Sequence, residues 1–211
     1  MTPVLLPLLA FTVAAALLTI TPGADTAMVL RTSTADGPRA GVATALGICL
    51  GLLVWGVGAA FGLTALLAAS ALAFTALKWL GAAYLVYLGL RLLLRPRSSM
   101  APGAAATAGR ADGLSAFRRG LLTNLLNPKV GVFYISFLPQ FIPHGVNVAA
   151  FSLLLAAVHV ALSLVWLCLL VALTVPLARV LSRPAVVRGL DRLTGCVFVG
   201  FGLRLALSEH P

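Results

Sequence analysis

Two charged side chains interrupt long apolar runs, and each stands beside a proline. Asp25 closes the sequence TPGAD at positions 21–25, and Lys129 closes the sequence NPK at positions 127–129. A charge near the centre of a transmembrane helix costs about 2.5 to 3.5 kcal/mol, so such residues usually have a function. A carboxylate accepts a proton or an ammonium group, and an ammonium donates to a carboxylate. The pair predicts a site for a zwitterion or a proton; the alternative is a structural ion pair that joins two helices.

The prolines predict that both apolar segments are broken helices. A proline removes a backbone hydrogen bond that lipid cannot replace, so the break must be satisfied by protein or by a wet cavity. Interruptions at matching places in two halves of a chain indicate a transporter's binding site, although two simple proline kinks are the alternative. The candidate substrate-binding residues are those of the two breaks: Thr21, Pro22, Gly23, Asp25, Asn124, Asn127, Pro128 and Lys129.

Other residues extend this prediction. A half-helix starting near Gly23 would direct backbone N–H groups and a positive dipole end at a carboxylate, while Asp25 meets an ammonium or a proton. His159 is a second candidate for proton coupling, because imidazole titrates near neutral pH; a polar contact with a neighbouring helix is the alternative. Trp55 or Trp166 would then contact the side chain of the bound molecule, unless they only pack in the core.

The composition shows which elements must position these residues. The chain has 211 residues, of which 61% are hydrophobic and 9% charged, whereas a soluble domain carries about 25% charged residues. A bilayer crossing needs roughly 20 apolar residues, so we expect an all-α integral membrane protein with six transmembrane helices. The expected spans are Val4–Leu30, Gly41–Leu67, Leu77–Leu94, Phe117–Leu138, Val148–Val175 and Leu190–Leu207.

The positive charge follows the gaps between these spans. The net charge is +10, and arginines occupy alternate gaps, as the positive-inside rule describes. Membrane lipid is therefore the expected partner of these arginines, and nucleic acid is not. With these gaps on the cytoplasmic side, six crossings place both termini outside. The arginines are Arg31 and Arg39 in the first gap, Arg91, Arg95, Arg97, Arg110, Arg118 and Arg119 around the second, and Arg179, Arg183, Arg188 and Arg192 around the third.

Two halves of the chain resemble each other. GLRLLL at Gly89–Leu94 recurs as GLRLAL at Gly202–Leu207, and Pro22 corresponds to Pro128. With an odd number of helices in each half, the halves enter the membrane from opposite sides and form an inverted repeat. We therefore expect a first three-helix repeat over residues 1–95, a cytoplasmic linker over 96–116 and a second repeat over 117–211, with the first and fourth helices broken at proline.

Several residue types point away from other functions. No HExxH or GxSxG motif is present, so an enzyme is disfavoured. The cysteines Cys49, Cys168 and Cys196 are scattered, so we expect no metal site, no disulfide and no cofactor. The pairs Gly47–Gly51 and Gly58–Gly62 have GxxxG spacing, which favours close helix packing within the chain and leaves a homodimer open.

Three segments resemble the LysE/RhtB family of amino acid exporters. They are TPGAD at Thr21–Asp25, KWLGAAYLVYLG at Lys78–Gly89 and NLLNPKVGVFYISFLPQF at Asn124–Phe141. The resemblance implies efflux of amino acids or close derivatives from a bacterial cell across the inner (cytoplasmic) membrane. It also implies that the proton or membrane potential drives transport, without an ATP-binding part. The family's TPGP pattern departs at Ala24, which replaces the second proline.

The expected function is secondary active export of a small neutral amino acid by alternating access, with protonation of Asp25 coupled to transport. Two alternatives stay open at this point. One is a passive channel or small-ion permease on the same fold. The other is a membrane scaffold that transports nothing, which would leave the charges in the spans unexplained.

Overall fold

The computed structural model describes residues 4–69, 71–96, 112–181 and 183–207, and this part of the chain is helical apart from short connections. The predicted linker over 96–116 falls largely on residues 97–111, which lie outside the described residues. The helices are α1 (Leu5–Ile20), α2 (Ala24–Ala35), α3 (Pro38–Ala69), α4 (Ala71–Leu94), α5 (Gly113–Leu125), α6 (Pro128–Val132), the π-helix η1 (Phe133–Phe137), the 3-10 helix η2 (Leu138–Phe141), α7 (Val148–Ala172), α8 (Thr174–Leu181) and α9 (Pro184–Leu207).

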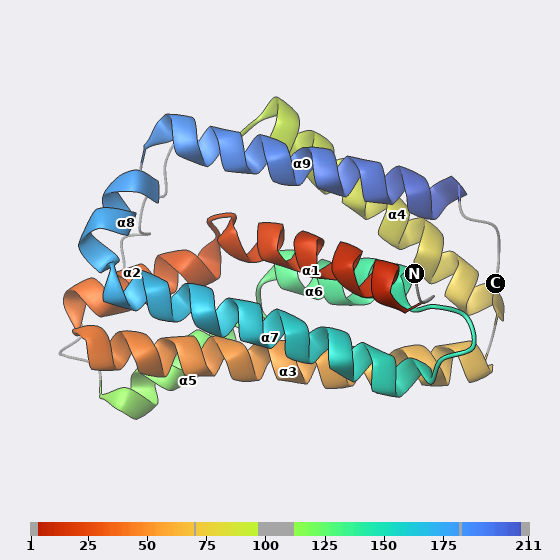
Figure 1. Cartoon of the computed structure of the whole chain (residues 1–211), viewed down its shortest axis with the longest axis horizontal. Helices are drawn as coiled ribbons and strands as arrows, with labels where there is room; N and C mark the ends of the chain where they lie inside the picture. The colour runs from red at the N-terminus through yellow and green to blue at the C-terminus, as the bar shows by residue number, and fades with distance from the viewer. Residues whose placement is uncertain (1–3, 70, 97–111, 182, 208–211) are drawn as a thin grey trace.

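The helices form two groups with the broken segments between them. Helices α4 and α9 run side by side along one edge, and α3, α5 and α7 pack together along the other (Figure 1). Helix α1 and the segment from α6 to η2 lie between the two groups, where α1 contacts α7 and η2. The middle of the molecule is therefore built from the two segments that the sequence predicts to be interrupted.

Two described helical stretches are long and apolar enough to cross a membrane, Pro38–Gly62 and Val148–Ala172. Counting each of two bent pairs as one span gives four, and Ala82–Leu94 is a shorter apolar helix. Large apolar side chains also face outward, such as Phe61, which is 63% exposed, and Val165, which is 71% exposed. Such exposure is unfavourable in water and natural in lipid.

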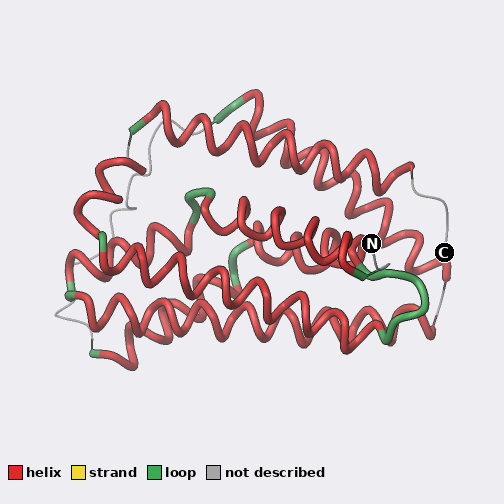
Figure 2. The backbone as a smooth tube through the Cα atoms, in the orientation of Figure 1, coloured by secondary structure: helices red, strands yellow, loops and turns green. Residues whose placement is uncertain are grey.

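Both predicted breaks are present as bends between helices. Helices α1 and α2 meet at 48°, and α5 meets the segment that begins at Pro128 at 50°. Figure 2 shows both connections as short loops near the middle of the molecule. At the first break the backbone is extended at Thr21 and Gly23. At the second, the side chain of Asn127 accepts a hydrogen bond from the Lys129 amide, and Pro128 occupies the first turn of α6, where its missing N–H is tolerated.

Glycines set the spacing between α3 and α5. A Cβ atom on Gly47 would lie 2.0 Å from the carbonyl oxygen of Phe117, and one on Gly51 would lie 2.5 Å from Oδ1 of Asn124. These contacts show that the first GxxxG pair packs inside the chain. By contrast, a Cβ atom on Gly58 or Gly62 would have no described atom within 4 Å, so the second pair faces outward.

Helices α4 and α9 cross through a reciprocal glycine contact. A Cβ atom on Gly89 would meet Val199 at 2.7 Å and the carbonyl oxygen of Gly195 at 2.7 Å. One on Gly202 would meet Val86 at 2.8 Å and the carbonyl oxygen of Ala82 at 3.0 Å. The contacting residues of α4 are Ala82, Val86 and Gly89, and those of α9 are Gly195, Val199 and Gly202. The two sets have the same spacing along the chain. Each helix therefore uses equivalent positions to contact the other.

An aromatic core holds the segment from α6 to η2 in place. Phe133, Phe137 and Phe141 recur at helical spacing, and all are buried. The Phe11 ring of α1 lies 5.6 Å from that of Phe133, and the Phe201 ring of α9 lies 4.5 Å from that of Phe137, both measured between ring centroids. The part of the second broken segment that follows Pro128 is thereby anchored between α1 and α9.

Candidate functional site

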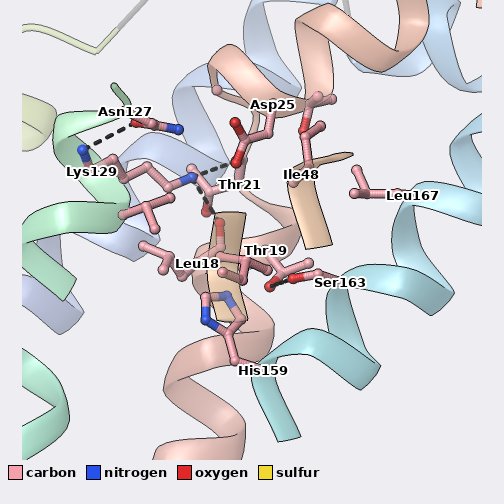
Figure 3. Close-up of a pocket in the computed structure, with 14 residues that line it drawn as sticks. Leu18, Thr19, Thr21, Asp25, Ile48, Asn127, Lys129, His159, Ser163 and Leu167 are labelled. Atoms are coloured by element: carbon pink, nitrogen blue, oxygen red, sulfur yellow. Dashed lines mark hydrogen bonds between the residues drawn. The ribbon is translucent and has the colours of Figure 1, made fainter. Parts of the chain in front are cut away.

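The two breaks meet at one small cavity. Its volume is about 30 Å³, enough for roughly two water molecules. Figure 3 shows Lys129 reaching toward Thr21 and Asp25, with His159 and Ser163 approaching from α7. The cavity is lined by polar residues of both breaks and of α7, and by apolar residues of the surrounding helices: Leu18, Thr19, Thr21, Gly23, Asp25, Thr26, Ile48, Leu52, Asn127, Lys129, Val130, His159, Ser163 and Leu167.

Asp25 lies in the first turn of α2 and is held from the opposite half of the chain. Its Oδ2 accepts a hydrogen bond of 2.8 Å from Nδ2 of Asn124 at the end of α5. Its Oδ1 is buried and accepts no hydrogen bond from the described residues. A buried carboxylate oxygen without a donor is costly, so this atom is suited to receive a proton or a cationic group.

Lys129 provides hydrogen-bond donors to backbone carbonyls at the first break. Its Nζ donates hydrogen bonds of 2.8 Å to the carbonyl of Leu18 and 2.9 Å to that of Thr21. These carbonyls belong to the last turn of α1, where a helix has no intrahelical donors left and carries a partial negative charge. The ammonium also lies 3.5 Å from the point where a Cβ atom on Gly23 would sit, beside the start of α2. Lys129 of one half thus stabilises the broken helix of the other.

His159 borders the cavity from α7 and is 2% exposed. Its Nδ1 lies 3.2 Å from the hydroxyl of Tyr134, and the two rings stack with their centroids 5.6 Å apart. Tyr134 belongs to the π-helical turn η1, a conformation that is frequent at functional sites. The hydrogen bond orients the imidazole at the edge of the cavity.

The structure brings most of the predicted residues together. The cavity is lined by Thr21, Gly23, Asp25, Asn127, Lys129 and His159. Asn124 is not among the lining residues, and its side chain donates a hydrogen bond to Asp25. Pro22 is buried within the first break, whereas Pro128 is exposed at the start of α6. Trp55 does not line the cavity; it packs on Gly131, and its Nε1 donates a long hydrogen bond of 3.5 Å to the carbonyl of Asn124.

Several residues at the site were not predicted. Thr19 and Ser163 line the cavity, and their hydroxyl oxygens lie 3.4 Å apart. Ser163 follows His159 by four positions on an apolar helix, so the polar face of α7 was readable in the sequence. On α9, Asp191 is fully buried one turn before Thr194, whose hydroxyl contacts that of Thr21.

Comparison with known proteins shows which family the chain belongs to. The chain matches the LysE type translocator family over residues 16–209. It is 35% identical to an uncharacterized membrane protein, YrhP, of Bacillus subtilis, across 95% of this chain and 99% of that one. It is 31% identical to a homoserine/homoserine lactone efflux protein of Salmonella typhimurium, across 95% and 96% of the two chains. A leucine efflux protein of Salmonella choleraesuis is 32% identical, across 94% of each.

No solved structure matches the chain. The family match and the relatives each span nearly the whole sequence, including both breaks and the residues around the cavity. The family consists of transporters and not enzymes, in agreement with the sequence analysis. The chain therefore belongs to the LysE family of membrane translocators.

Proposed function

We propose that this protein is a secondary active exporter of small neutral amino acids across the bacterial cytoplasmic membrane, coupled to the proton motive force. Relatives named as efflux proteins for leucine and for homoserine support amino acid export. Asp25 gives the most direct structural support, because its buried Oδ1 accepts no hydrogen bond from the described residues and lies at the cavity between the two breaks.

An amino acid has one ammonium and one carboxylate, and the cavity presents a partner for each. The ammonium would pair with Oδ1 of Asp25. The carboxylate would meet the start of α2, where Gly23 provides no side-chain cap, and the ammonium of Lys129 beside it. When no amino acid is bound, a proton takes its place on Asp25. Because the amino acid and the proton bind the same carboxylate in turn, export of the amino acid is coupled to entry of a proton.

The size of the cavity supports the proposal of alternating access. At about 30 Å³ it holds no amino acid, so binding requires the two breaks to move apart on one side of the membrane or the other. An inverted repeat supports such a movement. The two bends of 48° and 50° are alike, and the reciprocal contacts of Gly89 and Gly202 relate α4 to α9 as equivalent helices.

The proposed topology has six crossings with both termini outside. Exposed arginines Arg39, Arg119 and Arg179 belong to the start of α3, to α5 and to α8, and these parts lie at one end of the molecule (Figure 1). Helix α1 begins and α9 ends at the opposite end. This distribution supports a cytoplasmic face at the arginine-rich end.

Export from proteoliposomes tests the role of Asp25. The wild-type protein should move a neutral amino acid faster when a pH gradient is imposed, and Asp25→Asn should remove that dependence because the side chain no longer exchanges a proton. Asp36→Asn, at the other end of α2, is the matched control and should keep it. Coupled transport by Asp25→Asn at the wild-type rate would rule out this mechanism. If the rate of amino acid export by the wild-type protein does not depend on the pH gradient, the protein is instead a passive channel.

A further inference from the structure

Two hydroxyl groups line the cavity apart from the charged pair. Thr19 approaches from α1 and Ser163 from α7, and their side chains point toward each other (Figure 3). Asp25 and Lys129 reach the cavity from the two breaks, above the hydroxyl groups in this view. A ligand whose ammonium and carboxylate lie at the charged end therefore has the two hydroxyl groups within the same cavity for its side chain.

These hydroxyl groups have only a weak partner in each other. Their oxygens lie 3.4 Å apart, whereas an O–H···O hydrogen bond is usually near 2.7 to 2.8 Å. Thr12, two turns earlier in α1, instead donates to the carbonyl of Leu8 at 2.8 Å. Among the described residues, the Thr19 hydroxyl makes no such bond within its helix, and Ser163 is its one partner. Both hydroxyl groups are thus able to form a shorter bond to a third group.

The surroundings of the two hydroxyl groups select for a small polar group without charge. Ser163 is 4% exposed, and His159 and Leu167, one turn away on either side, are 2% and 3% exposed. A charged substituent would find no counter-ion among the described partners of either hydroxyl. An apolar substituent would separate the two oxygens and leave them unpaired, which is costly in a buried site. A hydroxyl group donates to one oxygen and accepts from the other.

We propose that Thr19 and Ser163 form a subsite for a hydroxyl group on the substrate side chain, so that the protein exports threonine in preference to valine. This inference rests on the proposed function. When the cavity opens, the substrate hydroxyl enters between the two oxygens and replaces their long contact with two shorter bonds. Threonine and valine have nearly the same shape and differ by a hydroxyl in place of a methyl group. A difference in their export therefore reports on hydrogen bonding and not on fit.

Export of threonine and of valine from proteoliposomes tests the subsite. The wild-type protein should prefer threonine by about fivefold or more, the effect of leaving one buried hydrogen-bonding group unpaired. The double variant Thr19→Val with Ser163→Ala removes both hydroxyl groups with little change of shape and should bring the ratio close to one. Because both amino acids are measured on one preparation, the ratio does not depend on how much protein is folded. Thr12→Val, in the same helix but outside the cavity, is the matched control and should keep the wild-type ratio.

A conservative variant separates the hydroxyl from the rest of the side chain. Thr19→Ser keeps the hydroxyl and should keep the preference for threonine; loss of the preference there would assign it to the methyl group and overturn the inference. A double variant that still prefers threonine also overturns it, because the hydroxyl is then recognised elsewhere. If the wild-type protein exports no amino acid, the proposed function fails and the subsite with it. An active wild type that exports threonine and valine equally refutes the subsite alone.

Discussion

Replacing Lys129 with methionine tests how the first break is stabilised. The ammonium donates to the carbonyls of Leu18 and Thr21, at 2.8 Å and 2.9 Å, and methionine keeps the apolar stem while removing both donors. The last turn of α1 would then present buried carbonyls without a partner. Asp25 would also lose the favourable electrostatic interaction with the Lys129 ammonium.

The expected cost follows from these contacts. A hydrogen bond that involves a charged group contributes about 1.5 to 3 kcal/mol, so two contribute about 3 to 6 kcal/mol. Water in the small cavity can replace part of this, since it has room for roughly two molecules. We therefore expect a loss of about 2 to 4 kcal/mol. For a protein of this size, that loss lowers the unfolding temperature by about 5 to 15 °C.

The measurement is thermal unfolding of the purified protein in detergent, followed by loss of the monodisperse peak in size-exclusion chromatography. Arg119→Met is the matched control, because Arg119 is an exposed residue of α5, and it should unfold within about 2 °C of the wild type. An unfolding temperature for Lys129→Met that equals the wild-type value would refute the stabilising role of the ammonium.

Combining two substitutions separates the charge from the hydrogen bonds. Adding Asp25→Asn to Lys129→Met should recover part of the lost stability, because the buried carboxylate is no longer left without a counter-charge. The carbonyls of α1 stay unsatisfied in the double variant, so recovery should be incomplete. Full recovery would mean that the uncompensated charge of Asp25 alone accounts for the effect of replacing Lys129.

Two further predictions concern the supports of the site. Gly51→Ala should destabilise the protein by about 1 to 3 kcal/mol and weaken substrate binding, because its Cβ would displace Asn124; Gly58→Ala, with open space around it, should be neutral or slightly stabilising by thermal unfolding. Tyr134→Phe should cost about 1 kcal/mol by removing the hydroxyl that contacts His159, and an unchanged unfolding temperature would show that this contact contributes nothing.

The sequence was sufficient for the local features of this protein. Its composition identified lipid as the solvent, because so few charged residues cannot cover a soluble core. Pro22 and Pro128 located both breaks, since a proline within an apolar helix disrupts the backbone hydrogen bonds of its own segment. TPGAD and the longer motif around Asn127 indicated the family, which the comparisons confirmed.

Only the tertiary structure decided which of these residues meet. The sequence did not reveal that Lys129 donates to the backbone carbonyls at the end of α1. Gly51 and Gly58 belong to the same type of motif, yet one packs against Asn124 and the other faces outward. Spacing along a helix defines a face, but what the face contacts depends on how the helix is rotated and on which distant segment packs there.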